Sequence, residues 1–308
     1  MSSLSLNLLG CFGAHLESHP IENPGVKAQA LLIYLAVEQH PQRREHLLTL
    51  LWPGMPEKSA RHNLSQAIYA LRQELPESPA LAGDELIPWL FTDRQTVQLN
   101  PAIQIEVDLH QMDRLLQSTR VHDHLDLADC DACIQSLEQA ASLYRGDFLG
   151  DFYLEDSLEF EHWAQAIREN YRRKTLDTLE TLTTIYIDQK AYEEARAFAQ
   201  RQLEIDNLRE SAYRQLMEIL ARSDQRVEAL SLYESCRQLL NDELGMAPTA
   251  RTIALYDNIR AGTLGLEAPK EQDVRGYQLK EKIGAGTYGV IYRAIQTTVS
   301  REVAVKII

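Results

Sequence analysis

Four side chains that can bind a metal ion lie within a short stretch: the imidazoles of His122 and His124 and the thiols of Cys130 and Cys133. Zinc accepts two imidazoles and two thiolates in a tetrahedron, and a Cys-x-x-Cys pair commonly supplies half of such a site. The alternative is a pair of polar loop histidines beside small buried cysteines at a helix start, and both interpretations stay open. A redox role is less favoured, because no strand-to-helix pattern surrounds the cysteines.

A second group of residues has the spacing of a phosphate-binding loop. Gly284, Gly286 and Gly289 follow a predicted strand, and the sequence Val-Ala-Val-Lys306 comes shortly after them. Together the two motifs resemble the start of a protein kinase domain. A dinucleotide-binding loop is the alternative, and it is disfavoured because a strand, not a helix, is predicted after Gly289.

The kinase resemblance implies that the glycine backbone closes over the phosphates of ATP, that Ile291 covers the adenine and that Lys306 pairs with the α and β phosphates. The implied ATP-binding residues are Ile283, Gly284, Gly286, Gly289, Ile291 and Lys306. The family's partner glutamate, HRD loop and DFG motif have no counterpart in these 308 residues. We therefore expect no kinase activity from this polypeptide. We expect it to come from a truncated reading frame or to be an incompletely assembled part of a longer regulator–kinase.

A third group of polar side chains lies on one face of the helix predicted from Pro56, as its first helical residue, to Leu75. Leu64, Ile68, Leu71 and Leu75 recur at helical spacing and should point inward. The candidate DNA-contacting residues on the rest of this helix are Lys58, Arg61, His62, Asn63, Gln66, Tyr69 and Arg72. Amides can pair with adenine in a major groove, and cations can meet phosphates. The two flanking arginines could instead pair with acids inside the domain.

The elements around this helix complete a small head. Short strands are expected within residues 4–21, helices over 27–39 and 43–51, and a hairpin turning at residues 93–95, with Arg94 as a further DNA contact. This order resembles the winged helix-turn-helix of response regulators, and the segment LLWPG…ARHNLSQAIYALRQEL resembles the recognition helix of SARP-type regulators. Such relatives usually carry more arginine there. The alternative is a winged helix that binds protein instead of DNA.

Residues 143–176 carry dense fragments of a second family. YRGDFL turns at Gly146 and Gly150, and DSLEFEHW and RENYRRKTL follow in a long helix that starts at Ser157. Leu158, Trp163, Ile167, Tyr171 and Leu176 fall near one face of that helix. The three fragments resemble the bacterial transcriptional activator domain, the helical-repeat module behind the winged helix of SARP-type regulators. A generic helical repeat without a regulatory role is the alternative.

A repeat of 34 residues supports a helical array. Ala195 and Ala229 are 34 residues apart, and so are Leu182 and Leu216. This period is that of tetratricopeptide helix pairs, which stack because neither helix buries its apolar stripe alone. A helix is expected to close at Gly245, and the last one to open at Pro248 and end near residue 262. We expect a protein partner to bind the concave face of the array.

Charge and composition limit the remaining classes. The net charge is −14, but residues 42–75 carry five basic and three acidic side chains, so a weak DNA-contacting patch is compatible with the acidic total. No apolar run is long enough to span a membrane, and no positive n-region marks a signal peptide. Four cysteines do not form a disulfide framework, so a reducing cytoplasm is the expected location.

The expected fold is mainly α-helical. It comprises a winged helix-turn-helix at 1–105, a helical domain at 106–262 that begins with a helix over 106–120, a linker at 263–276 and a kinase-like β fragment at 277–308. The expected function is a cytoplasmic regulator that binds double-stranded DNA, as a homodimer on repeated half-sites. ATP is a cofactor only with a complete kinase domain, and zinc is a second candidate. The alternatives are the regulatory part of a Ser/Thr kinase and a scaffold that binds no DNA.

Overall fold

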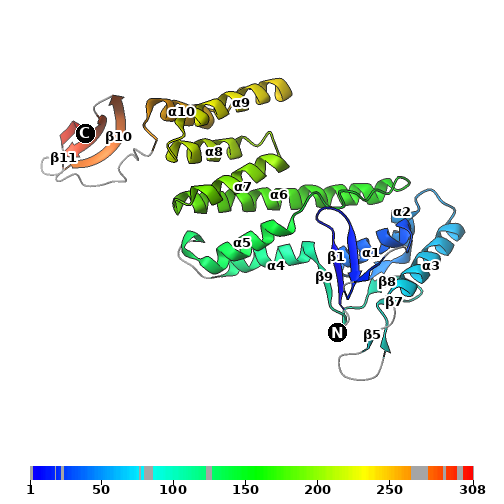
Figure 1. The fold of residues 1–308 in the computed structure, drawn as a ribbon. Helices are drawn as coiled ribbons and strands as arrows, with labels where there is room; N and C mark the ends of the chain where they lie inside the picture. Colours follow the sequence, from blue (N-terminus) through cyan, green and yellow to red (C-terminus); the bar gives the residue numbers. More distant parts are fainter. Residues whose placement is uncertain are drawn as a thin grey trace. The chain divides into compact units, whose positions relative to one another are not determined.

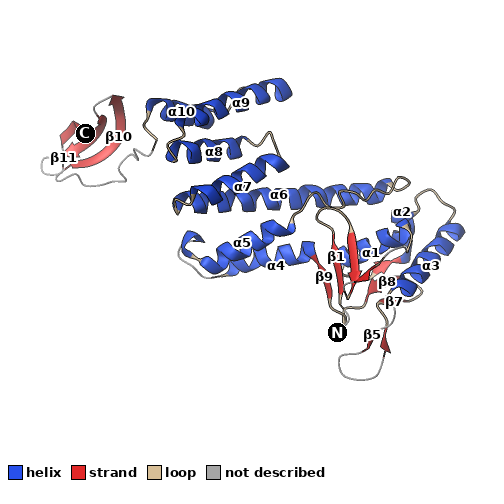
Figure 2. Ribbon diagram, in the orientation of Figure 1, coloured by secondary structure: helices blue, strands red, loops and turns tan. Residues whose placement is uncertain are grey.

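The protein is mainly helical, with small sheets near both ends of the chain, in a computed structural model (Figure 1; Figure 2). The structure describes residues 3–17, 19–21, 24–75, 78–79, 86–122, 127–264, 277–286, 289–296 and 301–307. Two compact units divide the chain, residues 1–212 and residues 213–308. Of the helices in these ranges, none combines the length and the apolar character that crossing a membrane requires.

The first unit begins with a head of short strands and three helices. The strands are β1 (Leu4–Asn7), β2 (Gly13–Leu16), β3 (His19–Pro20), β4 (Gln42–Arg43), β5 (Ser78–Pro79), β6 (Leu86–Ile87), β7 (Leu90–Thr92), β8 (Thr96–Leu99) and β9 (Ile105–Val107). The helices of the head are α1 (Val26–Glu38), α2 (Arg44–Leu51) and α3 (Glu57–Glu74). Helix α1 is buried on nearly all sides, as a helix at the centre of a small core must be.

Two small sheets frame these helices. One has the order β3-β2-β1-β9, in which β1 pairs antiparallel with β2 and parallel with β9. The other has the order β4-β8-β7, and its β7–β8 hairpin is the one predicted around residues 93–95. Strand β9 corrects the sequence analysis, which placed the start of a helix at residue 106. Strand β9 pairs with residues of β1 that lie 101 positions earlier in the sequence, so no local sequence pattern predicts this strand.

The rest of the first unit is helical. Its elements are α4 (Asp108–Val121), the short 3-10 helix η1 (Leu127–Asp129), α5 (Asp131–Leu143), α6 (Leu158–Asp188) and α7 (Tyr192–Ile205), with α8 (Glu210–Arg222) running across the boundary at 212. Ser157 is the N-cap of α6, and its hydroxyl accepts a hydrogen bond of 3.3 Å from the amide of Phe160. Leu158, expected on the apolar face, is 65% exposed, whereas Phe160 in the same turn of α6 is fully buried, so the buried side of this turn is the one that carries Phe160.

One continuous hydrophobic core joins the head to the first helices of the array. It contains Leu4 and Leu6 of β1 and Leu64 of α3, and also Phe148 and Phe160, which lie far along the chain. The four predicted inward residues of α3 are all buried, which confirms that part of the helical pattern. This core contains residues from both sides of the domain boundary predicted at residue 105. The head and helices α4–α6 therefore pack against each other through a shared core.

A pair of glycines explains the turn before α6. The amide of Gly10 donates to the carbonyl of Asp147 at 3.2 Å, and the amide of Gly150 donates to the carbonyl of Gly10 at 2.9 Å. A Cβ at Gly146 would come within 3.3 Å of the Cα of Gly10, and Gly10 itself has φ +121°. The YRGDFLG segment is therefore glycine-rich because two backbones meet there.

The second unit contains the last helices and a separate sheet. The helices are α9 (Arg226–Leu244) and α10 (Ala250–Ala261) after most of α8, and the strands are β10 (Tyr277–Gly286), β11 (Gly289–Gln296) and β12 (Arg301–Ile307). Helices α9 and α10 end at Gly245 (φ 64°) and Gly262 (φ 71°), as predicted. The last helix opens at Ala250, with Thr249 as N-cap, two residues after the predicted Pro248.

The predicted spacing of 34 residues reappears in the helix bounds. Helix α7 begins at Tyr192 and α9 at Arg226, and α6 ends at Asp188 and α8 at Arg222. Ala195 and Ala229 occupy equivalent positions in α7 and α9, and both are fully buried. Small residues at these positions let each helix approach its neighbour closely.

Candidate nucleic-acid interface

Helix α3 presents a polar, solvent-facing side at the edge of the head, beside β7 and β8 (Figure 1). Pro56 is its N-cap, and not its first helical residue as predicted. The side chains of Lys58, His62, Gln66 and Tyr69 are exposed, and Tyr69 reaches 62%. None of these four makes a hydrogen bond or ion pair with another residue in the part of the chain that the structure describes. They are available to a ligand.

The two flanking arginines of α3 differ in their surroundings. Arg61 donates to one carboxylate oxygen of Glu57 from Nε at 2.8 Å and from its terminal nitrogen at 2.6 Å. The alternative of pairing with an acid therefore holds for Arg61, whose charge is partly compensated. Arg72 donates to the hydroxyl of Thr92 at 2.7 Å, and so it keeps its full charge. The amide nitrogen of Asn63, which is half-buried, lies 3.2 Å from the sulfur of Met55.

The β7–β8 hairpin is held to the start of α2 and closed by an aspartate. The backbone amide of Arg44 donates to the carbonyl of Gln95 at 2.7 Å, and its Nε donates to the carbonyl of Asp93 at 2.8 Å. One carboxylate oxygen of Asp93 accepts the amides of Gln95 and Thr96, each at 2.6 Å. These backbone hydrogen bonds lower the pKa of Asp93. Between them Arg94 is exposed at the tip of the hairpin.

The sequence analysis missed the role of the two consecutive arginines before α2. Arg43 is exposed and Arg44 half-buried, and Arg43 pairs with Thr96 across the β4–β8 ladder. They bring positive charge to the β4 edge of the sheet, beside β8 of the hairpin. The doublet Arg43–Arg44 was the available signal, but the contact to residues 93–96 depends on long-range pairing that the sequence does not display.

The other flank of α3 is hollowed and partly apolar. A cavity of about 560 Å³ is lined by Lys27 and Trp52 and by Asn63, Gln66 and Tyr69 on α3. Exposed apolar side chains stand near this region, with Val26 at 53% and Met55 at 39%. This flank therefore has room for a protein surface as well as for a nucleic-acid backbone.

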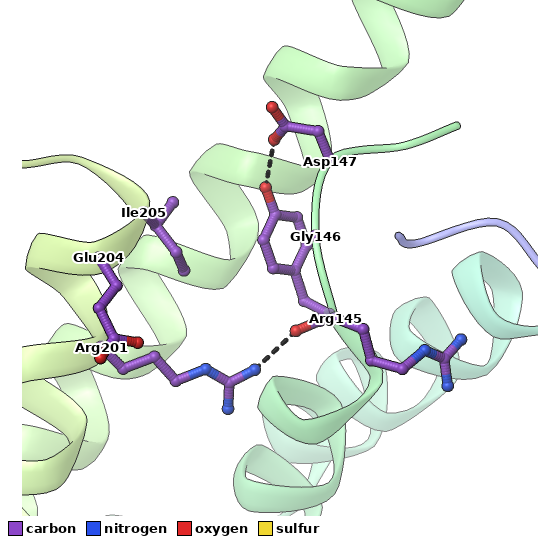
Figure 3. Close-up of a pocket in the computed structure, with 7 residues that line it drawn as sticks. Arg145, Gly146, Asp147, Arg201, Glu204 and Ile205 are labelled. Carbon is purple, nitrogen blue, oxygen red and sulfur yellow. Dashed lines mark hydrogen bonds between the residues drawn. The ribbon is translucent and has the colours of Figure 1, made fainter. Parts of the chain in front are cut away.

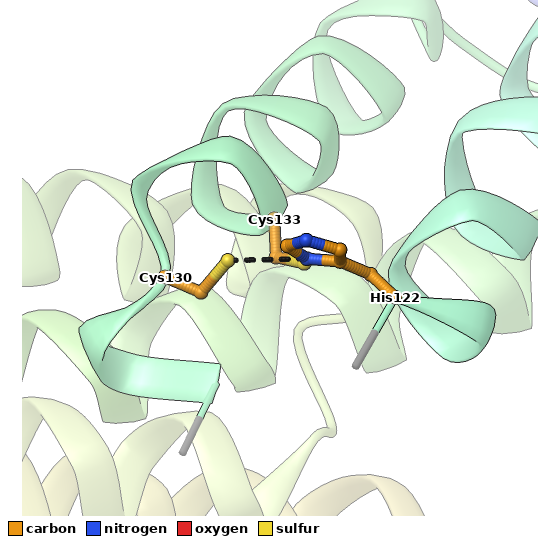
Figure 4. A group of neighbouring side chains, drawn as sticks. All are labelled: His122, Cys130 and Cys133. Atoms are coloured by element: carbon orange, nitrogen blue, oxygen red, sulfur yellow. Dashed lines mark hydrogen bonds between the residues drawn. The ribbon is translucent and has the colours of Figure 1, made fainter. Parts of the chain in front are cut away.

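Three of the four predicted metal ligands come together between α4 and α5 (Figure 4). The Nδ1 atom of His122 lies 3.1 Å from Sγ of Cys133 and 3.3 Å from Sγ of Cys130, and the three ligand atoms all lie within 4.8 Å of one another. Cys133 is buried, and burial together with the neighbouring Cys130 thiol raises its pKa. His124, the fourth predicted ligand, lies outside the described residues.

A polar pocket of about 330 Å³ lies where the YRGDFLG segment meets α7 (Figure 3). Its cation Arg201 donates to the carbonyls of Ala141 and Tyr144, at 3.0 and 2.6 Å. The hydroxyl of Tyr144 donates to Asp147 at 2.5 Å, and burial raises the pKa of this tyrosine. The guanidinium of Arg201 and the hydroxyl of Tyr144 are thus bound to groups of the chain itself. These hydrogen bonds hold the YRGDFLG segment against α5 and α7.

The predicted ATP-binding residues lie on an antiparallel meander of order β10-β11-β12. Gly284 and Gly286 belong to β10, so they lie within the strand and not after it as predicted. Gly289 begins β11 and pairs with Gly286, and Ile291 pairs with Lys306 of β12. A strand follows Gly289, as predicted. Ile283 is 54% exposed, and Lys306 is also exposed.

The chain matches the family described as "Bacterial transcriptional activator domain" over residues 107–260, from the end of β9 into α10. Among solved structures, it is similar to Mycobacterium tuberculosis EmbR in complex with a low-affinity phosphopeptide, with 21% sequence identity and a TM-score of 0.62. The similarity covers 84% of this chain and 65% of the EmbR chain, less than two thirds of that protein. At this identity the likeness concerns the fold alone. A search of curated proteins found no match.

Proposed function

The chain belongs to the bacterial transcriptional activator domain family, and we propose that it is a transcriptional regulator that binds double-stranded DNA through α3 and the β7–β8 wing. The observation that carries this proposal is the exposed polar side of α3, whose His62, Gln66 and Tyr69 have no partner among the described residues. A recognition helix needs such a side, because base edges are read by donors and acceptors that are not already occupied.

The residues of this surface divide into two roles. Asn63, Gln66 and His62 supply hydrogen-bonding groups for base edges in the major groove. Lys58, Arg72 and Arg94 supply charge for phosphates on either side of it, which positions the helix without reading sequence. Arg61 is already paired with Glu57, so we expect it to contribute less to phosphate binding than these three cations.

Salt dependence separates a DNA-binding head from one that binds protein. Each phosphate neutralised by a lysine or arginine adds about 0.9 to the slope of log affinity against log salt. With few cations on the surface, we expect moderate affinity and a slope of about −3 for one head, if Lys58, Arg72 and Arg94 each meet one phosphate. If the winged helix binds only protein, the chain should bind no DNA fragment at any salt concentration.

The test is selection of bound fragments from genomic DNA, followed by gel shifts over a salt series. The double variant His62→Ala/Gln66→Ala should lose specific binding while its helical circular dichroism stays unchanged. A matched control is Gln111→Ala/His162→Ala, which changes the same residue types at exposed positions of α4 and α6. If the first variant still selects the same fragments with unchanged affinity, α3 is not the reading surface.

We also infer that the helical repeats bind protein and that the regulator acts as a homodimer on repeated half-sites. Exposed apolar side chains support a protein contact in the second unit: Leu244 is 52%, Met246 61% and Ile253 39% exposed around the junction of α9 and α10. Light scattering of the purified chain, with and without a Met246→Glu change, tests the dimer. A monomer at all concentrations, free and on DNA, would contradict it.

A second candidate function is nucleotide binding by residues 277–307, as the first strands of a protein kinase domain. The hairpin closed by Gly286 and Gly289 and the placement of Lys306 opposite Ile291 favour it. An acyl-phosphate derivative of ATP should then acylate Lys306 in the protein from its native source, and free ATP should prevent it. Equal labelling of Lys280 and Lys306, unaffected by ATP, would count against a nucleotide site. The intact mass from the same source would show what accompanies this segment.

A further inference from the structure

We propose that His122, Cys130 and Cys133 bind a zinc ion that fastens the turn between α4 and α5. The three ligands come from the end of one helix, α4, and the start of another, α5 (Figure 4). A metal at this position would fix the end of α4 to the start of α5, the first helix pair of the activator domain, independently of DNA binding by the head.

The geometry is close to that of a tetrahedral zinc site. With zinc–nitrogen and zinc–sulfur bonds of about 2.1 and 2.3 Å, a nitrogen and a sulfur ligand lie about 3.6 Å apart and two sulfurs about 3.8 Å. The observed nitrogen–sulfur distances are 3.1 and 3.3 Å, and no pair of ligand atoms exceeds 4.8 Å. Side-chain movements that change each of these separations by no more than about 1 Å bring the atoms to coordinating distances.

Hydrogen bonding accounts poorly for the same arrangement. A neutral imidazole nitrogen either donates one hydrogen or accepts one through a single lone pair. Yet two sulfur atoms converge on the one Nδ1 atom of His122. A cation between the three atoms satisfies all of them at once, because each thiol then loses its proton to solvent and binds as a thiolate. Three protein ligands leave one tetrahedral position for water or a further side chain.

The backbone around the ligands is already fixed. Cys130 is the N-cap of α5: its amide donates to the carbonyl of Leu127 at 3.2 Å, and its carbonyl accepts the amide of Ile134 at 3.0 Å. The carbonyl of Ala128 accepts a hydrogen bond of 2.8 Å from the side chain of Gln189, beyond the end of α6. Leu127 packs against the core shared by α5 and α6. The cysteines are therefore held in position before any metal arrives.

Ligand chemistry selects the ion. Two thiolates with one imidazole suit zinc, whereas magnesium and calcium take oxygen ligands. A competing use of the same Cys-x-x-Cys pair is a disulfide, in which the two thiols lose two electrons to an oxidant and two protons to solvent. Zinc and the disulfide exclude each other, so the two states can be told apart in one preparation.

The test begins with the whole chain purified without chelator under reducing conditions. We expect about one zinc per chain by elemental analysis, as a single site requires, and a fall in melting temperature when a chelator removes it. Cys130→Ser and His122→Gln should each lower zinc affinity at least tenfold. Serine is also a favoured N-cap, so Cys130→Ser keeps the start of α5 and its circular dichroism.

The matched controls are Cys11→Ser and His162→Gln, which alter an exposed cysteine and an exposed histidine elsewhere. Both should keep the metal. Cobalt in place of zinc should give a sulfur-to-cobalt absorption band that Cys130→Ser weakens. The proposal is overturned by a reduced, folded chain that takes up no zinc, by zinc retained in both ligand variants, or by a Cys130–Cys133 disulfide in the native protein. None of these results bears on whether the head binds DNA.

Discussion

Arg72 of α3 donates a hydrogen bond of 2.7 Å to the hydroxyl of Thr92 on β7, so one side chain joins the candidate recognition helix to the wing. Helix and wing must keep a fixed separation if the helix lies in the major groove while the wing reaches the neighbouring backbone. Arg72 therefore has two roles in our proposal, as a cation for phosphate and as a link that sets the angle of the wing.

Two substitutions separate these roles. Thr92→Val removes the acceptor and leaves the charge, so we expect DNA affinity to fall about two- to tenfold, the worth of one hydrogen bond, with an unchanged salt slope. Arg72→Ala removes both and should also lower the slope by about 1. Gel shifts at several salt concentrations measure both quantities. Thr49→Val, on an exposed position of α2, is the control. An unchanged slope in Arg72→Ala would mean that this arginine meets no phosphate.

Asp108 fastens the amino-terminal strand to the start of α4. Its carboxylate accepts the amides of Leu8 and Leu9 at 2.9 Å and a hydrogen bond of 2.8 Å from Arg145. The aspartate is almost fully buried, whereas Arg145 is half exposed. Asp108→Ala leaves two buried amides without a partner and should cost about 3 kcal/mol of unfolding free energy. Arg145→Ala should cost about 1 kcal/mol or less.

Urea denaturation of both variants measures this difference. Asp108→Asn, which keeps an acceptor oxygen, should fall between them. Equal losses for Asp108→Ala and Arg145→Ala would show that the ion pair, and not the capping of the two amides, carries the stability.

Trp163 of α6 makes a further contact between the helical domain and the head. Its indole nitrogen donates to Glu38 of α1 at 2.8 Å, and its ring packs against Tyr34 and Phe160 at centroid distances of 4.9 and 5.1 Å. Trp163→Phe keeps an aromatic ring and should cost about 1 kcal/mol, the worth of the hydrogen bond. Trp163→Ala should cost about 3–5 kcal/mol. Thermal unfolding gives both, and similar losses would mean that the ring packing contributes little.

The local part of this fold was predictable from sequence because its signals are periodic. The stripe Leu64, Ile68, Leu71 and Leu75 fixed which side of α3 faces solvent, and Gly245 marked the end of α9. The wing followed from two short apolar runs around Asp93. In each of these the determining contacts lie within a few residues along the chain, where helical and turn periods can be read directly.

The contacts that join distant segments were not predictable. Strand β9 forms by pairing with the edge of β1, and the buried carboxylate of Asp108 accepts the amides of Leu8 and Leu9. Leu158 fits the apolar period of α6 but is exposed, because this turn buries Phe160 on its other side. The same limit holds for the candidate site: the face of α3 was visible in the sequence, whereas the link from Arg72 to Thr92 was not.

We expect His110 to make the stability of the joint between α1 and α4 depend on pH. Its Nε2 lies 3.1 Å from the carbonyl of Val37, and its Nδ1 lies 2.8 Å from the side-chain amide of Gln39. A neutral ring that donates from Nε2 and accepts at Nδ1 satisfies both contacts. Desolvation by burial lowers the pKa of His110, and the charge of Arg114 acts in the same direction. The hydrogen bond to the carbonyl of Val37 and the charges of Asp113 and Asp108 oppose it.

The sign of the effect follows from this lowered pKa. The unfolded chain binds a proton near the ordinary histidine pKa of about 6.5, and the folded chain binds it only at lower pH. The contribution of this joint to the free energy of unfolding is therefore complete above about pH 6.5. It is lost as the pH falls toward the pKa of His110 in the folded chain. We expect His110→Gln to flatten the fall in melting temperature below pH 6.5, relative to an exposed-histidine control, His162→Gln. If the melting temperatures of the two variants fall with pH in parallel, the protonation of His110 does not contribute to the pH dependence of stability.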